Sequence, residues 1–281
     1  MASAPVCFTP GDKYPSVSVT GRRCELMCDF CRGAYLKGMV PVRGPDELYQ
    51  TAARVWERGG KGLLVSGGFD RHGRLPLRPY LGAIRRIKED FDLVLSVHPG
   101  FLSRELLREL KRAGVDVIDY FLAVNPSLLR AMHLDLTPSD VARHFEACLE
   151  VGFEHVAPHV MVGFGGVVSE WDYRALSLAS ARRPYLVVVL VFIPTRGTPA
   201  GLMPPPSVGE VLEFMECARE ALSGSEVALG CMRPPWLKPV LDELVVRRGL
   251  VDRLAAPRPS LVERHGLTVI DACCSIPPSY I

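Results

Sequence analysis

The sequence predicts an α/β protein built as a (β/α) barrel. Short apolar runs rich in Val, Ile and Leu alternate with amphipathic stretches along all 281 residues. Such runs suit the buried strands of a parallel sheet, and the stretches between them suit the helices that cross from one strand to the next. Eight units in a chain of this length favour a full or nearly full TIM-type (β/α)8 barrel over an open doubly wound sheet.

The expected strands share an apolar, β-branched character, and most are bounded by turn or helix signals. They cover residues 16–20, 62–66, 93–97, 115–122, 156–162, 186–193, 227–230 and 267–271. A ninth run, residues 251–255, competes with the last of these. In a barrel of this kind the carboxyl ends of the strands lie on one face, which is where function gathers.

Four helices carry clear boundary signals. The first begins after Gly44 with the residues Pro-Asp-Glu and ends before a Gly-Gly pair. The second begins at Ser103, a helix-capping residue, and ends before Gly114. The third opens with Thr-Pro-Ser-Asp and the fourth with Pro-Ser-Val-Gly-Glu. These signals predict helices over residues 45–58, 103–113, 137–150 and 206–223.

Composition and charge narrow the class of protein. The chain is 48% hydrophobic and 23% charged, and 33 basic against 31 acidic residues give a net charge of +2. With so small a net charge, the protein has no strong positive electrostatic potential that would attract nucleic acid or an anionic membrane, so we expect neither as a partner. Residues 1–6 lack the regions of a signal peptide, and the longest apolar run, 185–193, is too short to span a bilayer. We expect a cytoplasmic protein.

Three cysteines, Cys24, Cys28 and Cys31, follow the first expected strand with C-x3-C-x2-C spacing. The chain has nine cysteines, an odd number, and three within eight residues fit metal ligation better than a disulfide framework. Thiolates are the usual ligands of iron–sulfur clusters, and three of them leave one iron of a [4Fe–4S] cluster open. A structural zinc site normally has paired C-x2-C elements and four ligands. The spacing therefore favours the cluster over zinc or merely buried cysteines.

With Phe30 before its last cysteine, the triplet resembles the radical S-adenosylmethionine (SAM) superfamily. The resemblance implies that the open iron binds the amino and carboxylate groups of SAM. It also implies that an electron from the cluster cleaves the sulfonium bond, and that the resulting 5′-deoxyadenosyl radical abstracts hydrogen from an unactivated carbon. The cofactor carries this chemistry while the protein positions and shields it. We assign no catalytic side chain beyond the clusters.

The ends of other expected strands resemble the SAM-binding segments of that superfamily. Residues 66–68 resemble its Gly-Gly-Glu segment, with Phe69 in the acidic position, and residues 161–166 resemble the apolar-Gly-x-Gly segment beside adenine. Residues 194–199 look like the Pro-x-x-Gly-Thr-Pro segment of biotin synthase and its relatives. Gly and Pro also simply mark turns, so the joint placement matters more than any one residue. The expected SAM-binding residues are Phe30, Ser66, Gly67, Gly68, His98, Asp119, Gly163, Phe164 and Ile193.

A second set of cysteines lies at other strand ends. Cys231 follows the run 227–230, while Cys273 and Cys274 follow the last run, on the expected catalytic face. Cys7 precedes the first strand, so residues 1–14 would have to fold over the barrel of residues 15–281. The hypothesis is that Cys7, Cys231 and one or both of Cys273 and Cys274 hold an auxiliary iron–sulfur cluster in a C-terminal auxiliary-cluster segment. The alternative is a set of unrelated free thiols. Cys148 and Cys217 lie inside amphipathic helices and are expected to be small buried residues.

The C-terminal sequence resembles lipoyl synthases. Residues 277–280 resemble the Ser-Tyr ending that places a serine oxygen on their auxiliary cluster, which adds Ser279 to the expected ligands. The lipoyl synthases with that Ser-Tyr ending also carry an N-terminal C-x4-C-x5-C triplet, whereas only Cys7 precedes the SAM motif here. The runs 20–33 and 230–234 and the final Cys-Cys pair are more similar to the biotin-synthase-like components of two-component archaeal lipoyl synthases. The sequence does not indicate which component this is.

The resemblance implies a sulfurtransferase that inserts sulfur into an unactivated C–H bond of an octanoyl chain on a lysine of a lipoyl-carrier protein. The auxiliary cluster would be the sacrificial sulfur source. The implied partners are the carrier protein, an electron donor and a related radical SAM protein. One alternative is another biotin-synthase-like enzyme, a mutase, methylase or maturase, with an electron-transfer auxiliary cluster. A second alternative is a non-catalytic iron–sulfur scaffold.

Overall fold

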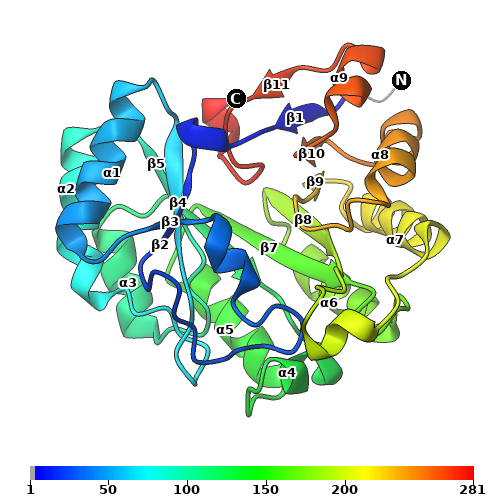
Figure 1. The fold of residues 1–281 in the computed structure, drawn as a ribbon, viewed down its shortest axis with the longest axis horizontal. Helices are drawn as coiled ribbons and strands as arrows, with labels where there is room; N and C mark the ends of the chain where they lie inside the picture. The colour runs from blue at the N-terminus through cyan, green and yellow to red at the C-terminus, as the bar shows by residue number, and fades with distance from the viewer. Residues whose placement is uncertain (1–3) are drawn as a thin grey trace.

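A computed structural model describes residues 4–281 as one parallel sheet that curls and carries helices on its outer side (Figure 1). The sheet has eleven strands in the order β11-β1-β10-β9-β8-β7-β6-β5-β4-β2-β3. Within residues 4–281 the edge strands β3 and β11 do not pair with each other, so the sheet is a curled half-barrel. The α/β prediction of a (β/α) barrel is confirmed. The strands are β1 (Val6–Phe8), β2 (Ser16–Ser18), β3 (Val40–Pro41), β4 (Gly62–Ser66), β5 (Val94–Val97), β6 (Val117–Phe121), β7 (His155–Val162), β8 (Leu186–Val191), β9 (Glu226–Leu229), β10 (Arg253–Ala255) and β11 (Val269–Ile270).

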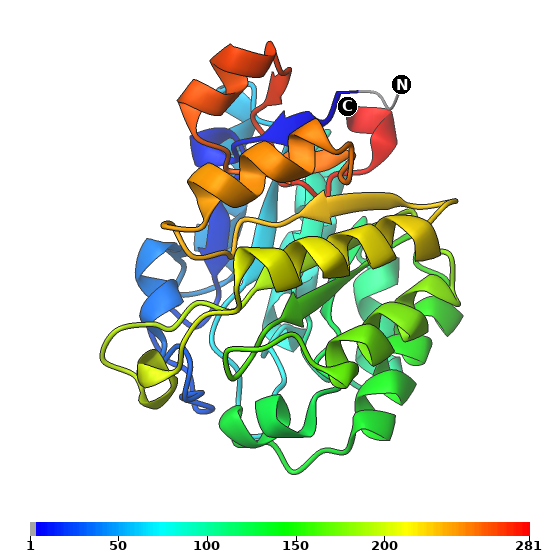
Figure 2. The same cartoon turned by 90° about the vertical axis from the view of Figure 1, so that its right-hand side faces the viewer.

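Helices follow most strands and cover the outer face of the sheet, as α7 and α8 (yellow and orange) do in Figure 2. The four expected helices are present, and the Thr137 and Ser207 side chains form capping boxes at the starts of α5 and α7. None of the helices in residues 4–281 is long and apolar enough to cross a membrane. The helices are α1 (Pro45–Glu57), α2 (Leu81–Asp90), α3 (Arg104–Arg112), α4 (Pro126–Ala131), α5 (Pro138–Glu150), α6 (Glu170–Ser180), α7 (Val208–Ala221), α8 (Lys238–Arg247) and α9 (Pro259–His265).

Two apolar clusters cover the two faces of the sheet, one cluster on each face. The larger joins strand residues such as Leu63 and Leu95 to helix residues such as Ile84, so it lies between the sheet and the helices. The smaller contains Val94 and Leu186 and no α-helix residue, so it lies inside the curl. Because side chains alternate along a strand, this assigns each strand residue to the outer layer or to the interior.

The N-terminal segment enters the sheet. We expected residues 1–14 to fold over the barrel, and residues 1–3 lie outside the described part. From Val6 the chain forms β1, which pairs in parallel with β10 on one side and β11 on the other. Both competing runs near the C-terminus therefore form strands, β10 and β11, with β1 between them.

The C-terminal segment fills the amino end of the barrel interior. Tyr185 Oη donates to the carbonyl of Ser275 at 2.6 Å, and Lys61 Nζ donates to the carbonyl of Tyr280 at 2.7 Å. Tyr185 precedes β8 and Lys61 precedes β4, so both lie at the amino ends of strands. Residues 271–281 thus run inward from β11 and close the end of the barrel opposite the strand carboxyl ends (Figure 1, red).

Candidate cluster and cofactor site

Cys24, Cys28 and Cys31 lie together in the loop between β2 and a short 3-10 helix, Ala34–Gly38. A hydrogen bond from the Cys28 thiol to Cys31 lowers the pKa of Cys31 to about 7 and is the largest cause of the raised pKa of Cys28. The charge of Cys24 adds to that rise in the pKa of Cys28, so all three thiols are neighbours. Met27 and Arg32 have left-handed φ angles of 42° and 46°. Such strain in side-chain-bearing residues is typical of functional loops.

The loops after β4, β6 and β8 hold the cysteine loop in place. The Glu25 N–H donates to the carbonyl of Phe69 at 2.8 Å, and the Asp29 N–H donates to the carbonyl of Ala131 at 2.7 Å. On the other side the Ala200 N–H donates to the carbonyl of Asp29 at 2.9 Å. The cysteine loop is therefore fixed by the segments that follow three strands of the sheet, β4, β6 and β8, as a rigid ligand site requires.

The glycine pair after β4 lies against the backbone of the first cysteine. The Gly68 N–H donates to Thr20 Oγ1 at 2.6 Å. A Cβ at Gly68 would lie 1.8 Å from the Arg23 carbonyl oxygen and 2.7 Å from Cys24 Cα. Gly67 has a φ of +153°, which favours glycine. Gly67 and Gly68 therefore pack too closely against the chain that leads into the cysteine loop for a larger side chain to fit. Ser66 precedes them and is paired with Ser18 of β2.

We predict that Gly68→Ala lowers both iron content and SAM cleavage, the latter by at least about tenfold, because the new methyl group displaces the Cys24 backbone. The matched control is Gly82→Ala on α2, where a Cβ meets nothing within 4 Å. Iron analysis and 5′-deoxyadenosine formation in reconstituted protein measure the effect. Equal iron and equal SAM cleavage in both variants would contradict it.

Aromatic side chains form a wall beside the cysteine loop. The rings of Phe30 and Phe164 meet edge to face with centroids 6.2 Å apart, and Phe164 meets Phe192 in the same way at 5.2 Å. Gly163 precedes them with a φ of +79°, and a Cβ there would lie 2.3 Å from Pro206 Cγ. Ile193 follows Phe192 in the chain. The structure therefore brings together Phe30, Gly163 and Phe164, in a surface that suits an adenine ring.

A buried acidic side chain, Asp119, lies inside the barrel. Asp119 is buried on β6, and neither of its carboxylate oxygens has a hydrogen-bond partner within residues 4–281. His98 Nε2 lies 3.9 Å from Asp119 Oδ2, and the His98 ring meets the His159 ring at 5.5 Å. Burial lowers the pKa of His98 to about 4, against the opposing effect of Asp119. His98 is therefore neutral at pH 7.

An orphaned carboxylate of this kind normally serves a bound molecule, because leaving it unpaired is costly. The hydroxyl groups of a ribose are suitable donors, and the Gly-Gly backbone and the aromatic wall both follow carboxyl ends of strands, those of β4, β7 and β8. The donors and acceptors present therefore fit SAM.

Cys231, Cys273 and Cys274 meet inside the barrel. A hydrogen bond from Cys274 is the largest cause of the lowered pKa of Cys273, and the charge of Cys231 adds to the raised pKa of Cys274. Cys231 follows β9 and is exposed, and desolvation is the largest cause of its raised pKa, followed by the charge of Cys273. Ser275 Oγ donates to Cys273 Sγ at 3.3 Å. The sequence alone did not single out Ser275. Its position directly after the Cys273–Cys274 pair was the one feature that could have indicated it.

The structure does not bring Cys7 or Ser279 to this group. Cys7 belongs to the outer cluster, while its neighbour Phe8 points into the interior. Burial and then the charge of Asp242, a residue of α8, raise the pKa of Cys7 to about 11. Ser279 lies beside Tyr280, whose carbonyl accepts from Lys61 at the amino end of the barrel. The sheet separates Cys7 from the interior thiols, and the C-terminal segment carries Ser279 to the far end.

Two buried arginines fix the two segments that carry these cysteines. Arg233 pairs with Asp242 through two hydrogen bonds of 2.7 Å and donates to the carbonyl of Gly230 at 2.5 Å, next to Cys231. Arg253 pairs with Glu226 and donates to the carbonyls of Cys274 at 2.8 Å and Ile276 at 2.6 Å. A buried guanidinium is costly unless it is fully paired, as both are here. They position Cys231 against Cys273 and Cys274.

Within residues 4–281 no three His, Cys, Asp or Glu side chains converge closely enough to hold a single metal ion. A cubane cluster presents separate iron corners, so its ligands need not converge on one point. Thiolate donors of the kind found in both cysteine groups fit iron–sulfur clusters.

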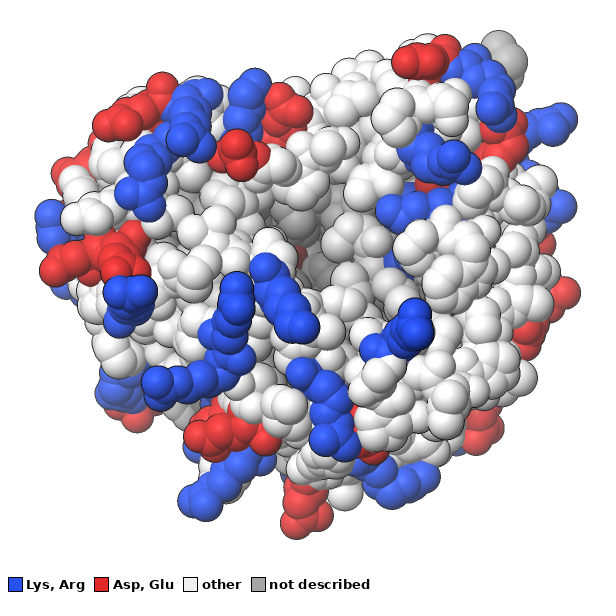
Figure 3. Space-filling model, in the orientation of Figure 1, with Lys and Arg blue, Asp and Glu red and all other residues white. Residues whose placement is uncertain are grey.

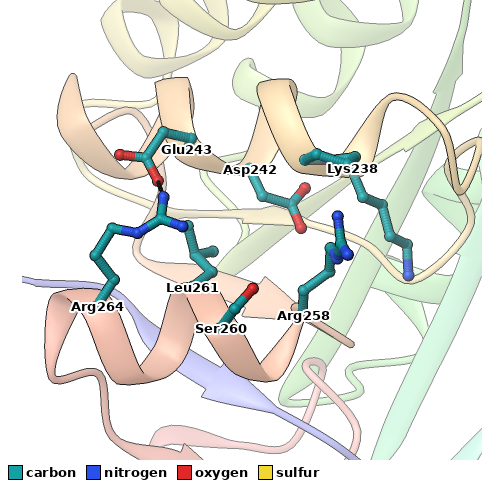
Figure 4. A pocket seen from close by; sticks show the side chains of 8 residues that line it. Lys238, Asp242, Glu243, Arg258, Ser260, Leu261 and Arg264 are labelled. Atoms are coloured by element: carbon teal, nitrogen blue, oxygen red, sulfur yellow. Dashed lines mark hydrogen bonds and ion pairs between the residues drawn. The ribbon is translucent and has the colours of Figure 1, made fainter.

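A further pocket lies between α8 and α9 and holds none of the expected site residues (Figure 4). The Arg264–Glu243 ion pair of 2.8 Å lines it, together with Lys238, Asp242 and Arg258. Its acidic side chains are already paired with arginines, Asp242 with Arg233 and Glu243 with Arg264. It plays no part in the sites described above.

Comparison with known proteins identifies relatives of the chain. The radical SAM superfamily profile matches residues 18–175. A tRNA-2-methylthio-N(6)-dimethylallyladenosine synthase of Herpetosiphon aurantiacus is 26% identical over 191 residues, 64% of this chain and 44% of that protein. The heme chaperone HemW of Bacillus subtilis is 27% identical over 155 residues, 51% of this chain and 41% of that protein. The chain therefore spans less than half the length of these curated relatives.

Solved structures share the fold at low sequence identity. Methylornithine synthase superposes with a TM-score of 0.67 and 15% identity, covering 95% of this chain and 84% of that chain. HydG, a maturase of the [FeFe]-hydrogenase, superposes with a TM-score of 0.65 and 17% identity, covering 90% of this chain and 57% of that chain. Both comparisons concern the fold alone.

Proposed function

The chain belongs to the radical SAM superfamily, and we propose that it is a sulfur-inserting member of it, a component of a lipoyl synthase. Membership implies a [4Fe–4S] cluster and SAM, for which Cys24, Cys28 and Cys31 are the expected cluster ligands. The proposed substrate is an octanoyl chain on a lysine of a carrier protein. The observation that carries the proposal is the second cysteine group, Cys231 with the Cys273–Cys274 pair, in the same interior as the SAM residues.

In this proposal the second cysteine group holds an auxiliary iron–sulfur cluster. When bound, SAM with its cluster supplies a radical that removes hydrogen from the substrate, and the auxiliary cluster supplies the sulfur. The barrel residues hold the reactants and exclude water. Val188 and Leu190 point into the interior, and apolar walls of this kind suit an alkyl chain.

Ser275 takes the place that the sequence suggested for Ser279. It lies at hydrogen-bond distance from Cys273, on the same buried segment, so it is the serine nearest to the proposed cluster ligands. A serine oxygen is a weaker ligand for iron than a thiolate, which suits a cluster that must give up sulfur. The methylthio group in the name of the Herpetosiphon relative is also joined through a carbon–sulfur bond.

The test is to incubate reduced, reconstituted protein with SAM and an octanoyl-lysine peptide and to follow the peptide by mass spectrometry. We expect 5′-deoxyadenosine together with a peptide that has gained one sulfur, with a related partner protein added if the single chain gives none. SAM cleavage without sulfur transfer, partner present, would indicate a mutase, methylase or maturase. No SAM cleavage at all would indicate a non-catalytic scaffold.

A further inference from the structure

We propose that the rim of the barrel mouth is a docking surface for an acidic protein domain that carries the acyl-lysine. The rim surface consists of exposed apolar side chains around the cysteine loop and of exposed arginines that form no ion pair within residues 4–281. The inference rests on the proposed function and adds to it where the carrier domain binds and which charges hold it. The residues of the rim surface are Arg22, Arg23, Met27, Tyr35, Arg71, Arg196, Leu202 and Met203.

The apolar part of the rim surface projects from the body of the protein. Leu202 is 94% exposed at the end of the short 3-10 helix Pro199–Leu202, and Met203 beside it is 38% exposed. Figure 2 shows this loop projecting to one side of the sheet (yellow-green). Met27 and Tyr35 of the cysteine loop are 39% and 37% exposed. Folding leaves these side chains in water, and an exposed apolar group of this kind indicates a contact surface.

Hydrogen bonds join the two apolar loops into one surface. Tyr35 Oη and Thr195 Oγ1 lie 2.8 Å apart, and the Ala200 N–H donates to the carbonyl of Asp29 at 2.9 Å. Arg196 follows Thr195 in a turn that leaves its side chain exposed. The projecting loop is thus fixed to the cysteine loop, beside the opening through which a substrate chain would enter.

The charged part of the rim surface is basic. Arg22, Arg23, Arg71 and Arg196 are exposed, and the structure gives none of them an ion pair with any residue from 4 to 281. Nearby carboxylates are engaged: Asp29 pairs with Arg32 and His133, Glu25 accepts the Arg71 N–H, and Asp70 accepts two backbone N–H groups. Lys and Arg side chains stand along the edge of the central hollow in Figure 3. An acidic partner surface complements this arrangement.

The chemistry of the rim favours a protein over RNA as the occupant. Three of the four apolar side chains of the rim surface, Leu202, Met203 and Met27, offer no flat face on which bases stack, and stacking is a main source of affinity for single-stranded nucleic acid. Tyr35 is the one aromatic side chain among the four, and its hydroxyl group lies at hydrogen-bond distance from Thr195. Met, Tyr and Arg are the residues enriched in protein–protein interfaces. The small net charge of +2 also argues against a general nucleic-acid surface.

The experiment measures binding of the reconstituted protein to an octanoylated, acidic lipoyl-carrier domain by calorimetry. The double variant Arg71→Glu/Arg196→Glu is expected to bind about tenfold more weakly, and Leu202→Ser severalfold more weakly. The matched control is Arg85→Glu, an exposed arginine on α2 without an ion pair to the described residues, which should bind like wild type. Added salt should weaken wild-type binding more than binding by the double variant.

Activity on two substrates separates docking from chemistry. The Leu202→Ser variant should convert a short octanoyl-lysine peptide at the wild-type rate and lose rate only on the carrier domain. If the double variant binds the domain like wild type while wild type thiolates the peptide, the docking surface is wrong and the function stands. If wild type neither binds the domain nor thiolates the peptide, the function is wrong and the docking inference falls with it. Tighter binding to single-stranded RNA than to the domain, lost in the double variant, also overturns the inference.

Discussion

Replacing Cys28 with alanine is expected to abolish SAM cleavage, lowering 5′-deoxyadenosine formation by roughly a thousandfold. Loss of a residue that merely orients a metal ligand already costs about 10–100-fold, so loss of a ligand should cost more. Cys28 is buried and hydrogen-bonded to Cys31, so no other thiol can take its place without moving the loop. After reconstitution the variant should contain about four fewer irons per chain than the wild-type protein.

The control for Cys28→Ala is Cys217→Ala. Cys217 was expected to be buried in its helix, but it is exposed on α7, far along the chain from either cysteine group. Its replacement should leave iron content and SAM cleavage unchanged, which separates ligand loss from a general effect of losing a thiol. A Cys28→Ala protein that kept both its iron and its SAM cleavage would refute the assignment of the triplet.

The cysteine loop could be predicted because its signal is local. Three ligands within eight residues, after a recognisable strand, need no knowledge of distant contacts. Cys231 could be placed at a strand carboxyl end because it directly follows the apolar run of β9. The nine strand predictions succeeded for the same reason, since each run carries its own apolar pattern. The sequence did not show that the chain turns inward after β11, so that the Cys274 carbonyl accepts from Arg253 at the start of β10.

Cys7 shows where local patterns stop being informative. It lies on a three-residue strand whose partners in the sheet are Leu254 and Val269, more than two hundred residues away in the chain. No periodicity in residues 1–14 indicates that pairing, and a shift of one position decides which face of the sheet receives the side chain. The sequence therefore predicts that the N-terminal segment folds over the barrel, whereas in the structure its residues Val6–Phe8 form a strand of the sheet.

The buried arginines and the orphaned carboxylate were also beyond the sequence. Arg233 and Arg253 are of a type that is mostly exposed, and their burial depends on carbonyls and carboxylates from other elements. The position of Asp119 at a strand end was visible, but its lack of any hydrogen-bond partner within residues 4–281 is a property of the packed interior. Such features arise from tertiary contacts alone.

The Cys273→Ala variant is expected to keep SAM cleavage and lose sulfur transfer by roughly a hundredfold or more. Cys273 accepts hydrogen bonds from Cys274 and Ser275, which favours its thiolate, the form that binds iron. Arg253 fixes the segment by bonding the Cys274 carbonyl, so the loss of one sulfur should not displace it. Iron analysis should show about four fewer irons per chain, while 5′-deoxyadenosine formation without substrate stays at the wild-type level.

Cys7→Ala is the matched comparison for Cys273→Ala, because both cysteines were proposed as auxiliary ligands and the structure separates them. Cys7 packs in the outer cluster beside α8, on the other face of the sheet from Cys274. Its replacement should therefore leave the second set of irons and sulfur transfer intact, at a small cost in thermal stability from the lost burial. Loss of iron in Cys7→Ala, with full iron in Cys273→Ala, would mean that the N-terminal segment leaves the sheet to bind the cluster. The pair of variants thus decides which side of the barrel wall holds the auxiliary site.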